Sequence, residues 1–133
     1  MLVSVCLVVV ISACQSVPED RESWLINTSL VTLLANPSKY DNIHVETTGF
    51  LRYAGGPVVF LTRDHAKAYD IASGIPLDVP DEKRKSLKDA SCYDKYVRVI
   101  GRFVVVHEYV GKIIKVQAIR DAFNHTSKDC WHE

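Results

Sequence analysis

The side chains best suited to chemistry in this chain are its four cysteines and the histidines near its C-terminal end. Cys6 and Cys14 lie within and at the end of an apolar run that opens the chain, whereas Cys92 and Cys130 belong to its body. Two cysteines form a disulfide in an oxidising compartment, while reduced cysteines and imidazoles bind zinc. The compartment in which the protein folds therefore decides which chemistry Cys92 and Cys130 perform.

A metal site is one alternative for the C-terminal residues. His125, Cys130 and His132 are spaced by five and two positions, and Cys92 could complete a set of four. Zinc accepts such ligands, but this spacing matches no common zinc motif. An enzyme that uses the same side chains is a related alternative, although no serine lies in a Gly-x-Ser-x-Gly nucleophile elbow. We therefore expect a protein with no catalytic residues, no bound metal and no cofactor.

The start of the chain indicates export. Residues 2–11 are apolar apart from Ser4, and this run of about ten residues is too short to cross a bilayer of about 30 Å as a helix. Such a run fits the apolar region of a signal peptide, and the small residues Ser12 and Ala13 fit a processing site. The sequence thus predicts a signal peptide over residues 1–13. A buried N-terminal strand remains an alternative, as does a cleaved signal peptide without a lipid.

The residues at the end of this run, Ile11-Ser12-Ala13-Cys14, resemble the lipobox of bacterial lipoproteins. The resemblance implies that Cys14 becomes the first residue and carries a diacylglycerol on its sulfur, with fatty acids such as palmitate. Several acyl chains anchor a protein stably, whereas a single chain is marginal. The resemblance also implies a cell-envelope protein facing the periplasm, and Gln15 favours the outer membrane. This sequence departs from the usual pattern in having no Lys or Arg before Cys14.

The polar, acidic residues 14–23 are typical of a short tether, which leaves residues 24–133 as the folded domain. An exported domain folds under oxidising conditions, which favours a disulfide between Cys92 and Cys130. That bond would close a loop of roughly 38 residues and stabilise the domain by about 3–4 kcal/mol. Two free, half-buried thiols are the alternative.

The charge balance argues against nucleic acid as the main partner. The 133 residues include 16 basic and 16 acidic side chains, so the formal net charge is zero. Nucleic-acid binders usually carry a basic excess, because neutralising phosphates dominates their affinity. The hydrophobic content of 47% indicates a folded globular domain. We expect the partners to be the membrane, through the N-terminal lipid, and an unidentified envelope protein or small ligand.

The body of the chain predicts an all-β domain with short helices, because apolar and polar residues alternate over several segments. Gly49 and Gly101 lie within two of these segments, and glycine inside a strand often marks a bulge or a tight bend. The expected elements are a helix over 29–35, strands over 43–54, 58–63 and 67–73, a helix that begins near residue 80, and strands over 95–109 and 112–122.

Five strands with a helix between the third and the fourth follow the order of the OB-fold. The short N-terminal helix and the turn after it also resemble the opening of small exported bacterial OB-fold proteins. This match covers about residues 30–122 and implies a five-stranded OB-fold barrel, without naming a ligand. The residues that carry it are Leu33, Leu34, Asn36, Pro37, Tyr40, Asp41, Val45, Gly49 and Phe50, together with residues 96–103.

An OB barrel typically binds its ligand on the face of its second and third strands. Aromatic and basic side chains in that region could stack on bases or sugars, or could simply alternate between core and solvent. The function expected from the sequence is a membrane-anchored envelope lipoprotein with a non-catalytic binding module, and an oligosaccharide- or nucleic-acid-binding domain is the alternative. The expected ligand face consists of Tyr53, Phe60, Arg63, His65, Lys67 and Tyr69.

Overall fold

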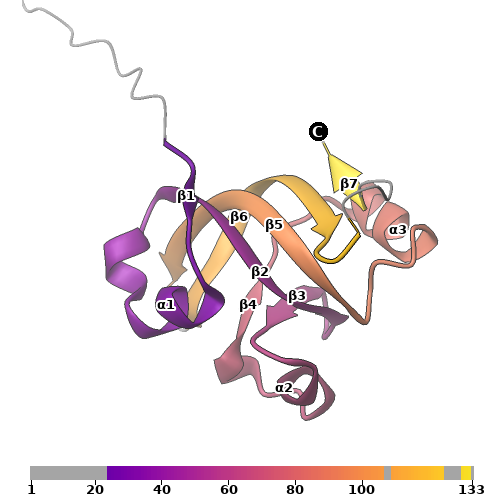
Figure 1. The fold of residues 1–133 in the computed structure, drawn as a ribbon, viewed down its shortest axis with the longest axis horizontal. Helices are drawn as coiled ribbons and strands as arrows, with labels where there is room; N and C mark the ends of the chain where they lie inside the picture. Colours follow the sequence, from indigo (N-terminus) through magenta and orange to yellow (C-terminus); the bar gives the residue numbers. More distant parts are fainter. Residues whose placement is uncertain (1–23, 107–108, 125–129, 133) are drawn as a thin grey trace, which may run out of the picture.

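The computed structural model describes residues 24–106, 109–124 and 130–132. They form a mostly β domain with a few short helices (Figure 1). The strands are β1 (Ile26–Asn27), β2 (Ile43–Tyr53), β3 (Pro57–Phe60), β4 (Gly74–Pro76), β5 (Lys95–Val106), β6 (Tyr109–Asp121) and β7 (Trp131–His132), and the α-helices are α1 (Leu30–Ala35), α2 (Arg63–Lys67) and α3 (Asp81–Asp89).

The strands form one strongly curled, largely antiparallel sheet that makes a half-barrel (Figure 1). Their order is β4-β3-β2-β5-β6-β7, and β1 adds a short parallel pairing to β2. The two sides of the curl meet beyond β4, where Leu77 forms a parallel bridge with Ile113 of β6. The backbone N–H of Asp78 donates to the carbonyl oxygen of Ile113 at 2.8 Å. The sheet therefore curls far enough for strands distant in its order to touch.

The hydrophobic core fills the inside of this curl. Alternate residues of β2 and β5 face inward, in keeping with the two-residue period of a strand. Helix α1 buries Leu30 and Leu33 in the same core, and helix α3 buries Leu87 there. The inward set includes Val45, Leu51, Val97, Val99, Phe103, Ile113 and Ile119, with Leu33 from α1 and Leu87 from α3.

The two predicted helices are confirmed. Helix α1 begins after Ser29, whose hydroxyl accepts a hydrogen bond from the Thr32 backbone N–H at 3.1 Å, as an N-cap does. It ends at Asn36, because the following Pro37 cannot continue it. Helix α3 lies between β4 and β5 and carries Asp81 and Glu82 in its first turn, where carboxylates favour the helix dipole.

The second and third predicted strands need correction. The second strand, β3, ends at Phe60 rather than at residue 63, and the segment expected as the third strand contains the end of α2 and a 3₁₀ turn. The third strand is the short β4, which begins where the predicted strand was expected to end. Thr62 caps α2 by accepting from the His65 N–H at 3.3 Å, and Ala66 is completely buried. Because alanine has the highest helix propensity, the alanines of this segment also favour a helix over a strand.

The two strand glycines behave differently. Near Gly101, the pairing of β5 with β6 shifts register between Ile100 and Arg102, which confirms the predicted irregularity. At Gly49 the pairing with β5 continues without a shift, so no bulge is present there. The missing side chain of Gly49 instead allows Val59 of β3 to pack directly onto the β2 backbone. At both positions the absence of a side chain lets a residue of the neighbouring strand approach the backbone closely, Val59 at Gly49 and Ile113 at Gly101.

Candidate functional site

The expected ligand face divides into several environments. Phe60 is completely buried under α2, where it packs with Phe50, Val58 and Ala66 in a small apolar cluster on the outer side of the sheet. Its ring therefore belongs to the packing of α2 and is not available to a ligand. Helix α2 contacts this part of β2 and β3, whereas Tyr53 and Tyr69 remain exposed, at 54% and 53%.

The other expected residues engage in local contacts. Arg63, His65 and Lys67 lie on α2 rather than on a strand. The Nδ1 atom of His65 lies 2.7 Å from the hydroxyl of its N-cap Thr62, which fixes the imidazole against its own helix. These three side chains therefore do not line a common strand face.

The two expected tyrosines are each paired with another residue. The Arg52 guanidinium lies over the ring of Tyr69 at 5.1 Å. The ring of Tyr53 contacts that of Tyr93 edge to face at 6.0 Å. Burial raises the pKa of the Tyr93 phenol, and the neighbouring Tyr53 raises it further, whereas Arg84 lowers it. Tyr93 is therefore a neutral phenol at physiological pH.

An open pocket of about 460 Å³ lies beside this region, at the start of β5 and the end of β6. Its volume falls within the range of about 300–1,000 Å³ that is usual for small-molecule sites. Of the expected ligand-face residues, only Arg63 reaches it. The pocket is lined by Phe50, Arg63, Asp94, Lys95, Tyr96, Asp121, Phe123 and Asn124.

Three aromatic rings form a continuous series along this pocket. Phe50 and Tyr96 are directly opposite each other on β2 and β5, and their rings meet edge to face at 5.2 Å. Tyr96 meets Phe123 in the same way at 5.8 Å. The series runs from the buried Phe50 to Phe123, which is 79% exposed. Such edge-to-face pairs hold aromatic rings in fixed relative positions.

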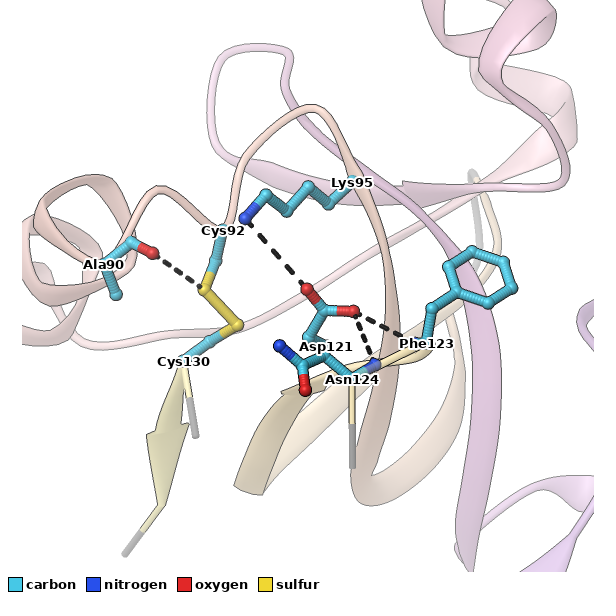
Figure 2. Close-up of polar contacts among 7 residues, drawn as sticks. All are labelled: Ala90, Cys92, Lys95, Asp121, Phe123, Asn124 and Cys130. Carbon is cyan, nitrogen blue, oxygen red and sulfur yellow. Dashed lines mark hydrogen bonds and ion pairs between the residues drawn. A yellow bond between two sulfur atoms is a disulfide. The ribbon is translucent and has the colours of Figure 1, made fainter. Parts of the chain in front are cut away.

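The polar groups of the pocket are held by short local interactions (Figure 2). One oxygen of the Asp121 carboxylate accepts hydrogen bonds from the backbone N–H groups of Phe123 and Asn124, at 3.0 and 3.2 Å. The other oxygen faces the Lys95 ammonium at 4.0 Å. Asp121 thereby fixes the turn that carries Phe123. At the opposite wall, the Tyr96 hydroxyl accepts from the Arg63 backbone N–H at 3.3 Å.

The predicted disulfide between Cys92 and Cys130 is present, with a Cα–Cα distance of 5.8 Å. It joins the segment after α3 to the start of β7, and Figure 2 shows it beside the pair of Lys95 and Asp121. With both sulfurs in this bond, Cys130 is not a free thiolate for the alternative zinc set. His125 lies outside the described residues, and within the described part of the chain no three His, Cys, Asp or Glu side chains cluster as metal ligands.

Sequence reasoning missed most of the pocket because its residues come from four separate segments. Two signals were available. Phe50 and Tyr96 alternate with the residues that face the main core, so an aromatic ring at each position indicates packing on the outer face of the sheet. The segment from Asp121 to Asn124 also has an aspartate two residues before an exposed Phe, which is typical of an Asx turn. Neither signal shows that these rings meet.

Cys14 and the other residues of the predicted signal peptide and tether, residues 1–23, lie outside the described residues. Among the residues that are described, no helix has the length and apolar character needed to cross a membrane. Comparison of the chain with protein-family models, curated proteins and solved structures found no match.

Proposed function

We propose that this protein is a lipid-anchored component of the bacterial cell envelope whose domain acts as a non-catalytic binding module. The observation that carries the binding role is the open pocket at the ends of β5 and β6. Its aromatic series and its fixed polar groups form a prearranged surface for a ligand. The proposed lipid anchor rests on the resemblance of the residues ending at Cys14 to a lipobox.

The domain in this proposal is of the OB type. Strands β2, β3 and β4 form a meander, α3 follows the third of them, and β5 returns to pair with β2. The parallel bridge from Leu77 to Ile113 brings β6 against the segment after β4, as closure of a five-stranded barrel requires. The short strands β1 and β7 are additional to the five strands of an OB-type barrel.

The start of the described domain supports attachment near a membrane. Nine residues, 15–23, separate the anchor cysteine from Trp24. Trp24, Leu25 and Ile26 follow directly and are exposed, with Trp24 at 87%. Tryptophan is favoured at the membrane–water interface. The disulfide supports an oxidising compartment such as the periplasm, and Gln15 favours the outer membrane.

A binding role fits the pocket better than catalysis does. A carboxylic acid that donates a proton near neutral pH is usually buried in an apolar environment. The Asp94 carboxylate is 67% exposed and lies 3.6 Å from the Arg52 guanidinium. The Asp121 carboxylate accepts two backbone hydrogen bonds and faces Lys95. Neither carboxylate therefore lies in the buried, apolar environment that such a general acid needs.

Substituting the anchor residue tests the membrane attachment. The Cys14→Ser variant of the full-length chain is expected to move from the membrane fraction to the soluble fraction, because serine cannot form the thioether to diacylglycerol. Fractionation of bacterial cells followed by immunoblotting measures this change. Cys6→Ser is the matched control, since Cys6 lies within the same apolar run, and it should leave the protein in the membrane. Equal membrane recovery of both variants would contradict the anchor.

A further inference from the structure

We infer that the pocket recognises an uncharged sugar ring within an oligosaccharide, with Phe123 as the stacking surface. This inference rests on the proposed binding function and specifies its ligand class. It places the ligand site in the pocket at the start of β5 and the end of β6, rather than on the face of β2 and β3 expected from the sequence.

The geometry of the aromatic series leaves a flat surface open. In an edge-to-face pair, the ring of each partner keeps at least one face uncovered by the other. Phe123 is 79% exposed, and its ring contacts that of Tyr96 edge to face at 5.8 Å. The Asp121 carboxylate accepts from the backbone N–H groups of Phe123 and Asn124, which lie on either side of the Phe123 α-carbon. An exposed ring on a hydrogen-bonded turn suits the apolar C–H face of a pyranose.

The polar groups around the ring suit hydroxyls, which both donate and accept hydrogen bonds. The Lys95 ammonium and the Asp121 carboxylate are 4.0 Å apart, beyond a direct hydrogen bond, so each keeps bonding capacity for a third group. Lys95 can donate to a hydroxyl oxygen, and Asp121 can accept from a hydroxyl hydrogen. The Asp94 carboxylate, on the same rim, is mostly exposed.

The positive and negative charges of the pocket lining balance, which favours an uncharged ligand. Arg63 and Lys95 supply two positive charges, and Asp94 and Asp121 supply two negative charges. A polyanion such as a nucleic acid would meet repulsion from the carboxylates as well as attraction, and the whole chain offers no basic excess.

The test uses the full chain, purified in detergent, and a tetramer of β-1,4-linked N-acetylglucosamine as the probe. We expect saturable binding by titration calorimetry, with saturation-transfer NMR signals on the sugar ring protons. Phe123→Ala should weaken binding by about tenfold or more, because the stacking surface is removed. Phe123→Trp, which retains a flat ring, should keep binding near the original affinity. Val31→Ala is the control, since Val31 is an exposed apolar side chain of α1 outside both the pocket lining and the expected ligand face, and it should leave the affinity unchanged.

The outcomes separate the ligand class from the binding function. Salt-insensitive binding of the tetramer that is lost in Phe123→Ala supports the inference. Binding of a thymidine oligonucleotide in place of the tetramer, with steep salt dependence and the same loss in Phe123→Ala, would overturn the sugar class and leave the binding module standing. Cleavage of the tetramer would overturn the non-catalytic role. Binding of neither probe would overturn the sugar inference, while the membrane release of Cys14→Ser tests the anchor independently.

Discussion

Reduction of the Cys92–Cys130 disulfide is expected to lower the free energy of unfolding by about 3–4 kcal/mol. The bond spans a sequence separation of 38 residues, and opening a loop of that size restores much conformational freedom to the unfolded chain. Both half-cystines are buried at 4% exposure, so their sulfurs also lose packing on separation. For a domain of this size the melting temperature should fall by about 10–15 °C.

Thermal unfolding followed by circular dichroism, with and without reductant, measures this effect. The Cys92→Ser/Cys130→Ser double variant provides the control. It should melt at the temperature of the reduced protein, and reductant should not change it further. Equal melting temperatures for the oxidised and reduced wild-type protein would show that the bond contributes nothing to stability.

The Gly49→Ala substitution is expected to destabilise the domain by about 2–3 kcal/mol through overpacking. A β-carbon at this position would lie 2.3 Å from a methyl carbon of Val59 and 2.8 Å from the Phe60 carbonyl oxygen. The valine side chain has little freedom to move because it is completely buried, and the carbonyl belongs to the β3 backbone. Accommodating alanine therefore requires β2 and β3 to separate.

Urea denaturation measures the loss of stability. Gly56→Ala is the matched control, because no atom lies within 4 Å of its added β-carbon. Its denaturation midpoint should stay close to that of wild type, with a free-energy change within about 0.5 kcal/mol. Equal midpoints for the two variants would mean that Gly49 does not mark a close approach of β3 to β2.

The sequence predicted correctly the elements whose ends or buried faces depend on local residues alone. Ser29 and the Asn36-Pro37 pair mark both ends of α1, and strict alternation marks the inward residues of β5. In the segment after Phe60 the local signals conflict. Alternating apolar residues indicate a strand, whereas the Thr62 cap and the alanines favour a helix. The contact of Ala66 with the apolar cluster on the outer face of the sheet favours the helix, and such a contact is visible only in the folded structure.

The pocket depends even more on tertiary structure. Phe50 meets Tyr96 because of the register between β2 and β5, and Phe123 joins them because Asp121 closes a turn at the end of β6. A shift of one residue in that register would send Tyr96 to the opposite face. The disulfide, by contrast, was predictable from the sequence, because Cys92 and Cys130 are the only cysteines in the body of the chain.

The intact mass of the protein, made in a bacterial host from the full-length gene, tests the central claim of an anchored, oxidised envelope protein most directly. We predict a chain that starts at Cys14 and is heavier by its lipid groups. Without reductant its mass should also be lower by two hydrogens, as the closed disulfide requires. A chain that retains residues 1–13, carries no lipid and has two free thiols in the domain would contradict the account.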